Sequence, residues 1–101
     1  MDSIERIKEK LLPIFDNEPI ERAILFGSYA KGSNDELSDV DIVIDSKGRL
    51  IGLDFFRFLD LVVRTLELDV DLFDVSEIVN GSTLQKEIDA GGVLLYERKI
   101  A

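Results

Sequence analysis

Cysteine and histidine are both absent from the chain, and tryptophan is absent as well. Without cysteine there can be no disulfide, no thiol nucleophile and no cysteine-ligated metal. Without histidine there can be no His-based catalytic triad and no His metal ligand, which argues against zinc. A bound metal would have to be held by oxygen atoms, so the composition favours a hard cation such as magnesium.

Basic residues are few: 12 Lys and Arg stand against 21 Asp and Glu, for a formal net charge of −9. General attraction to nucleic-acid phosphates depends on clustered Lys and Arg, so we expect no nucleic-acid partner. Long apolar runs are also missing, since no stretch approaches the roughly 18 residues of a membrane span. The N-terminus is charged within a few residues, so we expect no signal peptide, no membrane contact and a cytoplasmic location.

The 101 residues, 46% of them hydrophobic, are enough for one small core, and we expect one domain over residues 1–101. Apolar spacing predicts helices over 3–15, 53–66 and 82–90 and strands over 23–26, 39–45, 68–75 and 93–96. Ser3 or Asp2 would cap the first helix, and Pro13 with the segment 16–19 would end it. This alternation of helices and strands indicates an α/β domain.

Two of the predicted strands each contain a pair of aspartates. Asp39 and Asp41 lie two residues apart, so both side chains point to one face, with Cα atoms about 6.6–7 Å apart. Asp69 and Asp71 repeat this arrangement in a later strand. If the two strands are neighbours, up to four carboxylates converge, and a divalent cation would relieve their repulsion. The alternative is a solvated acidic face on a one-sided sheet.

A glycine-serine loop begins where the buried strand 23–26 ends. Gly27 allows a sharp turn, and successive backbone N–H groups there could form an anion-binding concavity, with the Ser28 hydroxyl and Lys31 as further donors. Gly27 and Gly32 have the spacing of a Walker A loop, but the Lys and Ser/Thr of that motif are missing. The loop therefore predicts a phosphate site beside a carboxylate site, as needed for a nucleoside triphosphate with magnesium. An ordinary turn with a solvated lysine is the alternative.

The combined string resembles a family signature. Gly27-Ser28-Tyr29-Ala30-Lys31-Gly32, six further residues and then Ser38-Asp39-Val40-Asp41 match the pattern G-S-x-A-x-G, spacer, S-D-x-D. This pattern is similar to that of the DNA polymerase β-like nucleotidyltransferases, above all their smallest members, the minimal nucleotidyltransferase (MNT) proteins. The family has a third carboxylate on a later strand, which we place at Asp71, with Asp69 as the alternative.

The resemblance implies a fold and a chemistry. The fold would be a small mixed sheet of about four strands flanked by helices. Asp39, Asp41 and Asp71 would be the catalytic residues and would bind two Mg²⁺ or Mn²⁺ ions, with Asp71 able to accept the proton of the attacking hydroxyl. Gly27 and Ser28, with Lys31, would bind the triphosphate of ATP. AMP would then pass to a hydroxyl acceptor and pyrophosphate would leave.

The predicted helix 53–66 is apolar on nearly all sides, which is more than one small sheet can cover. It could be covered by the terminal helices, by a second copy in a homodimer, or by a partner chain. The resemblance implies a HEPN-domain partner, paired as toxin with this chain as antitoxin, and a tyrosine of that partner as AMP acceptor. Two alternatives stay open: a non-catalytic antitoxin that neutralises its partner by contact, and a transferase acting on a small molecule such as an aminoglycoside.

Overall fold

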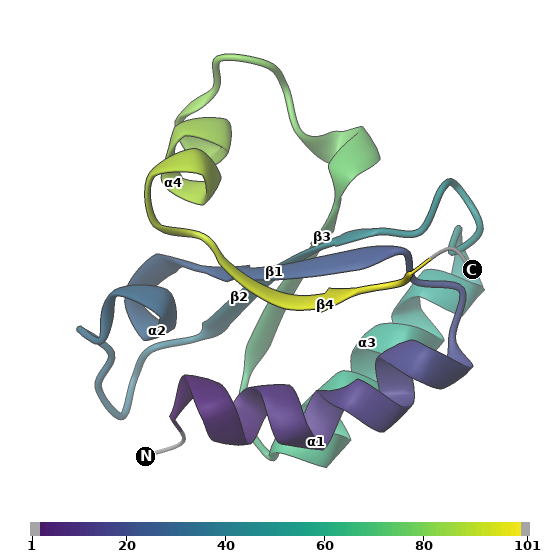
Figure 1. Ribbon diagram of the computed structural model, residues 1–101, viewed down its shortest axis with the longest axis horizontal. Coiled ribbons are helices and arrows are strands. Elements are labelled where there is room, and N and C mark those ends of the chain that lie inside the picture. Colours follow the sequence, from purple (N-terminus) through teal and green to yellow (C-terminus); the bar gives the residue numbers. More distant parts are fainter. Residues whose placement is uncertain (1–2, 100–101) are drawn as a thin grey trace.

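The computed structural model describes residues 3–99 and shows an α/β arrangement (Figure 1). In chain order the elements are α1 (Ile4–Asn17), β1 (Arg22–Phe26), α2 (Gly27–Lys31), β2 (Val40–Asp45), α3 (Leu53–Leu66), β3 (Val70–Asp74), the 3₁₀ helix η1 (Val75–Glu77), α4 (Thr83–Gly91) and β4 (Val93–Glu97). The predicted order of helices and strands is confirmed, and the loop after β1 begins with the short helix α2.

The four strands form one mixed sheet in the order β3-β2-β1-β4. β1 is antiparallel to both β2 and β4, whereas β2 and β3 run parallel. The register places Phe26 opposite Asp41 and places Asp41 opposite Asp71. Both expectations, a mixed sheet and neighbouring aspartate-bearing strands, are therefore confirmed.

The two faces of the sheet are covered differently. α1 and α3 pack side by side on one face, whereas α4 and η1 lie over the other (Figure 1). Along β2 the residues Val40, Ile42 and Ile44 are fully buried beneath α1 and α3, as alternation predicts. The main core lies on this face and also includes Ile7, Leu11, Phe15, Ala23, Leu25, Phe58, Val62, Leu66 and Leu95. Within residues 3–99, no helix combines the length and apolar character needed to cross a membrane.

α1 begins as predicted but ends later. The Ser3 side chain accepts a hydrogen bond from the Arg6 backbone N–H and caps the helix, while Asp2 lies outside the described residues. The segment 16–19 ends the helix as predicted, with Glu18 as C-cap, but the part of the prediction that assigned the end to Pro13 is wrong, since Pro13 lies inside the helix. The buried ring of Phe15 explains the continuation, because its packing against Phe58 and Tyr96 offsets the hydrogen bond that a proline cannot donate.

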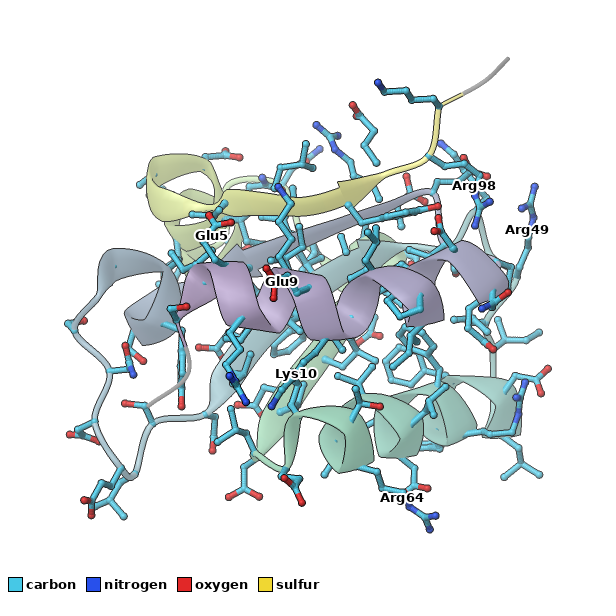
Figure 2. The ribbon with its side chains drawn as sticks, turned by 60° about the horizontal axis from the view of Figure 1, so that its bottom comes forward. Glu5, Glu9, Lys10, Arg49, Arg64 and Arg98 are labelled. Carbon is cyan, nitrogen blue, oxygen red and sulfur yellow. The ribbon has the colours of Figure 1, made fainter. Side chains whose placement is uncertain are left out.

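Arg98, which follows β4, fixes the C-terminal end of α1 (Figure 2). Its guanidinium donates to the carbonyl oxygens of Phe15 at 3.0 Å, Glu18 at 3.0 Å and Ile20 at 3.1 Å. The ring of Tyr96 lies 5.7 Å from the guanidinium carbon. The last carbonyl groups of a helix have no hydrogen-bond partner within the helix. The Arg98 side chain supplies donors to carbonyl groups at and just after the end of α1.

α3 has the predicted bounds, and its burial answers part of the question about its apolar surface. Phe58, Val62 and Leu66 are buried against the sheet and α1, so part of the helix is covered within the chain. Leu53 and Phe56 are 86% and 63% exposed. Together with the exposed Ile51 they form what we call the α3 patch, at the start of the helix.

Candidate active site

Four aspartates gather at one end of the parallel pair β2 and β3. Asp41 and Asp71 are register partners. The Val40 N–H donates to the Asp69 carbonyl at 2.9 Å, which carries the pairing one residue beyond the strands and brings Asp39 beside Asp69. The convergence expected from the two aspartate pairs is therefore observed.

The carboxylates of Asp39, Asp41 and Asp71 are close enough to disturb one another. Repulsion from Asp71, followed by burial and Asp69, raises the pKa of Asp39. Burial raises the pKa of Asp41 to about 6, with further repulsion from Asp71 and Asp39. At neutral pH the group thus holds mutually repelling charges, an arrangement that a cation or a proton would stabilise.

Asp71 and Asp69 differ in their relation to this group. The side chain of Asp71 interacts with both Asp39 and Asp41, whereas Asp69 acts on Asp39 alone among the carboxyls with a raised pKa in residues 3–99. Asp71 also occupies the register position directly beside Asp41. The geometry therefore favours Asp71 over Asp69 as the third carboxylate of the site, and its catalytic role remains a prediction.

Glu87 of α4 is a further acidic side chain near the site, and sequence reasoning did not find it. Its charge contributes to the raised pKa of Asp41. α4 reaches this position because the chain returns across the sheet between β3 and β4, packing against β1 and α2 (Figure 1). Only the topology brings residue 87 beside residue 41, since no spacing in the sequence indicates it.

Gly27 brings the backbone close to the carboxylate of Asp41. β1 ends at Phe26, opposite Asp41, and α2 begins at once with Gly27 at a φ of +75°. A Cβ atom at this position would overlap the carboxylate of Asp41. Glycine is thus required both by the left-handed conformation and by the space that Asp41 fills. The start of the predicted phosphate loop and the predicted metal ligands are therefore neighbours.

The remaining predicted loop residues lie around this junction. Ser28 is half-buried at the start of α2, and its carbonyl accepts the N–H of Ser33 at 3.0 Å. Lys31 is exposed, and its aliphatic stem lies beside Gly91 of α4. Tyr29 is buried in the core. The structure thus brings Gly27 to the carboxylate of Asp41, with Ser28 next to it in the chain, whereas Lys31 lies beside α4.

Ser38 shapes the loop that leads to Asp39. Its hydroxyl accepts the Asp35 N–H at 2.9 Å, and its own N–H donates to the Asp35 carbonyl at 3.2 Å. The Asp35 carboxylate in turn accepts the Leu37 N–H at 2.9 Å. Ser38 therefore closes a turn just before the first aspartate.

The donor set suits a hard divalent cation by its chemistry. Carboxylate oxygens are the ligands that Mg²⁺ prefers, and the raised pKa values show that these oxygens crowd one another. No group of three or more acidic side chains within residues 3–99 forms a preformed metal centre. This is compatible with magnesium, which is commonly held by one or two carboxylates together with substrate phosphates and water.

Comparison with known proteins agrees with this geometry. Residues 9–101 match the family described as "Polymerase beta, Nucleotidyltransferase". The chain is 34% identical over 77 residues to "Putative protein adenylyltransferase MJ0435" of Methanocaldococcus jannaschii, covering 75% of this chain and 82% of that protein. A second protein of that organism with the same description, MJ1215, is 32% identical over 82 residues, covering 77% of this chain and 95% of the relative.

Solved structures share the fold. A structure described as "Structure of putative minimal nucleotidyltransferase" superposes with a TM-score of 0.75 at 21% identity, covering 91% of this chain and 95% of that one. A chain of a toxin-antitoxin crystal structure with AMP-PNP gives a TM-score of 0.76 at 22% identity, with coverage of 91% and 74%. A chain from a complex of tri-AMPylated Shewanella oneidensis HEPN toxin with MNT antitoxin gives 0.71 at 23% identity, with coverage of 94% and 73%.

The family match spans most of the chain, and it includes the glycine-serine loop, the Asp39–Asp41 pair and the third aspartate that the fold brings to them. The protein therefore belongs to the polymerase β-like nucleotidyltransferase family.

Proposed function

We propose that this nucleotidyltransferase transfers AMP from ATP to a tyrosine hydroxyl of a HEPN-domain partner and thereby acts as the antitoxin of a toxin-antitoxin pair. One observation carries the proposal: Gly27 leaves room for the Asp41 carboxylate, and Asp41 is paired in register with Asp71. The turn that we propose to bind phosphate and a carboxylate pair are thus held against each other by the sheet. The relatives described as protein adenylyltransferases and as MNT antitoxin support the choice of a protein acceptor.

Each residue of the site would have a distinct task. The backbone of Gly27 and the hydroxyl of Ser28 would bind the β- and γ-phosphates, which holds the α-phosphorus near the carboxylates. Asp71 would accept the proton of the acceptor hydroxyl as its oxygen attacks the α-phosphorus. Lys31, whose stem lies against α4, would add positive charge near the outer end of the triphosphate.

Asp39, Asp41 and Asp71 would hold divalent cations, Mg²⁺ or Mn²⁺. Such ions neutralise charge on phosphate and on the entering and leaving oxygens in phosphoryl transfer. The carboxylates themselves would position that charge, because Asp41 lies in β2, Asp39 directly precedes the strand, and Asp71 is fixed beside Asp41 by the parallel pairing of β2 with β3. Burial of Asp41 strengthens its interaction with any cation.

The α3 patch would provide the contact with the HEPN partner. Exposed clusters of large apolar side chains are uncommon on proteins without partners, and Leu53 and Phe56 are mostly exposed. A homodimer through the same surface is the competing arrangement. Size-exclusion chromatography with light scattering, performed on the chain alone and with the partner, distinguishes the two. Phe56→Asp should weaken whichever assembly uses this patch.

The transfer reaction is tested by incubating the chain with its HEPN partner, ATP and magnesium, followed by intact-mass measurement. A gain of AMP mass on the partner, located to tyrosine by peptide mapping, is expected. The variant carrying Asp39→Asn and Asp41→Asn should bind the partner but transfer nothing.

Neutralisation of the partner's toxicity must be measured for the same proteins, the parent and the double variant. If the partner gains no mass and the double variant still neutralises it, the chain acts as a non-catalytic antitoxin. If purified aminoglycosides gain AMP mass and the partner does not, the acceptor is a small molecule. Either result would overturn the proposed reaction.

A further inference from the structure

Two phenylalanine rings meet on the face of the sheet that carries the active-site carboxylates. Phe26 of β1 and Phe73 of β3 have ring centroids 6.0 Å apart at an interplanar angle of 46°. Since β2 lies between β1 and β3, the two rings contact each other above that strand. Neither ring belongs to the main core beneath α1 and α3. We call Phe26 and Phe73 the ring pair.

The strand register places the ring pair beside the carboxylates. Phe26 lies opposite Asp41, and Phe73 lies opposite Val43, two residues beyond Asp41 in β2. Register partners on neighbouring strands point to the same face, and so do alternate residues along one strand. Asp71 and Phe73 therefore share the face of Asp41, and their own Cα atoms are about 6.6–7 Å apart along β3.

The two rings differ in exposure. Phe26 is 2% exposed, so its ring packs within the fold. Phe73 is only partly buried, and part of its ring remains in contact with solvent. The tilted contact with Phe26 holds the Phe73 ring in place, as is usual for aromatic pairs. Phe73 thus presents an ordered aromatic surface two residues from Asp71.

The order of the strands assigns the two sides of the site to two reactants. The turn at Gly27 follows β1, on one side of β2, whereas Asp71 and Phe73 belong to β3, on the opposite side. In phosphoryl transfer the attacking and leaving oxygens lie roughly in line on opposite sides of the phosphorus. With the triphosphate against Gly27, the leaving pyrophosphate lies toward β1 and the acceptor hydroxyl approaches from the β3 side.

We infer that Phe73 recognises the aromatic ring of the acceptor and so selects tyrosine. The inference rests on the proposed function and deepens it by naming a specificity-determining residue. The tyrosine ring packs against Phe73 while its hydroxyl, at the far end of the ring, reaches Asp71. The hydroxyl oxygen then bonds to the α-phosphorus, its proton passes to Asp71, and pyrophosphate leaves.

Two substitutions distinguish recognition from packing. Serine has a hydroxyl but no ring, so an acceptor with serine in place of tyrosine loses the contact with Phe73. Leucine retains apolar bulk at residue 73 without a ring, so Phe73→Leu preserves packing on Phe26 and removes only the aromatic surface. A nucleobase also stacks on aromatic rings, and such a role for Phe73 would appear as a change in ATP affinity.

The first measurement is the kinetics of AMP transfer to the HEPN partner. Phe73→Leu should lower kcat/KM for the partner about tenfold, because one aromatic contact is lost, and should leave KM for ATP within about twofold of the parent. The parent should prefer the tyrosine-bearing partner over a partner with serine at the acceptor position. Phe73→Leu should reduce this preference about tenfold.

The second measurement needs no catalysis. The labelled full chain, with magnesium and a non-hydrolysable ATP analogue, is titrated with N-acetyl-tyrosinamide and followed by NMR. Resonances of the Phe73 ring and the Asp71 amide should shift, whereas N-acetyl-serinamide should cause no shift. Phe73→Leu should weaken tyrosinamide binding about tenfold. Phe55→Leu is the matched control, since it removes a ring that packs against the core on the opposite face.

The outcomes separate this inference from the proposed function. Unchanged tyrosinamide binding in Phe73→Leu, shifts confined to other surfaces, or a fall in ATP affinity alone would overturn the role of Phe73, even if the parent adenylylates its partner. Tyrosinamide binding at Phe73 without AMP transfer to any protein would uphold that role and overturn the proposed reaction. Urea unfolding of each variant confirms that the changes do not arise from loss of fold.

Discussion

The two faces of the sheet use the same strands for different purposes. On the face beneath α1 and α3, the even-numbered residues of β2 are completely buried and the main core is continuous. On the face toward α4, the odd-numbered Asp41 is half-buried among other carboxylates, and α4 itself has no fully buried residue. A strand of six residues thus stabilises the fold on one face and builds a reactive group on the other.

The comparison predicts that substitutions on the α4 face change chemistry more than stability. Asp71→Asn should lower AMP transfer to the partner by about 10³-fold, because under the proposed function it removes both a cation ligand and the proton acceptor. Steady-state transfer rates measure this effect. Asp69→Asn is the matched control on the same strand end and should retain a rate within about fivefold of the parent. Equal losses in both variants would remove the distinction between the two aspartates.

Substitutions on the opposite face should have the reverse effect. Phe58→Ala should destabilise the fold by about 3–4 kcal/mol, because Phe58 is fully buried and contacts Phe15. Phe56→Ala, two residues earlier in the same helix and mostly exposed, should cost less than about 1 kcal/mol. Urea denaturation measures both. A large loss in the Phe56 variant would mean that the α3 patch is already covered in the isolated protein.

Gly27 is both a backbone position that needs a positive φ and a neighbour of the candidate site, so its substitution should affect both stability and nucleotide binding. Gly27→Ala places a Cβ against the Asp41 carboxylate and forces a non-glycine residue to a φ of +75°. We expect a loss of about 1–2 kcal/mol in the free energy of unfolding and a clear fall in ATP affinity. Gly32→Ala is the control, because it has the same φ but no atom within 4 Å of the added Cβ. If ATP affinity falls equally in both, the crowding at Asp41 is not its cause.

The smallest expected effect is a gain of stability from losing a charge. The pKa of Asp41 is raised to about 6 from 3.8, so the folded state holds this proton more tightly than the unfolded state. The resulting stabilisation is complete below about pH 4 and is lost as the pH rises through about 6. At pH 8 without metal, the free energy of unfolding of the Asp41→Asn variant should therefore exceed that of the parent by about 1 kcal/mol, allowing for solvent screening.

Magnesium should reverse the relative stability of the parent and the Asp41→Asn variant, so that the parent becomes the more stable protein. A cation that binds only the folded state stabilises it, and the parent retains the carboxylate that the variant lacks. This reversal is measured by the melting temperatures of both proteins at pH 8 with ATP, once in EDTA and once in magnesium. If magnesium with ATP stabilises the variant as much as the parent, Asp41 is not a ligand.

Periodicity predicted the elements of this fold, while the contacts between them required the structure. The bounds of α3 and the burial of Val40, Ile42 and Ile44 follow from spacing alone. Pro13 was expected to help end α1, because local propensity disfavours a proline there, whereas the helix continues past it and the packing of Phe15 against distant rings offsets the lost hydrogen bond. Tertiary contacts override propensity here, as is common.

The candidate site shows the same division. The motif identified Gly27, Ser28, Asp39 and Asp41, because these residues are adjacent or nearly so in the chain. The preference for Asp71 over Asp69 needed the register of β3 on β2, and the charge of Glu87 needed the return of α4 across the sheet. The coverage of α3 was left open, because only the placement of α1 shows which part of its apolar surface is buried.

Arg98 has a consequence for how the protein is made. Its guanidinium satisfies carbonyls of Phe15 and Glu18, which leave the ribosome some eighty residues earlier. Until then these acceptors must stay hydrated, and the edge strand β4 that pairs with β1 is also missing. Chains grow from the N-terminus, so the end of the first helix is completed among the last contacts of the fold. A translation product that stops short of Arg98 lacks these hydrogen bonds to the end of α1. Cellular proteases should therefore degrade it faster than the finished chain.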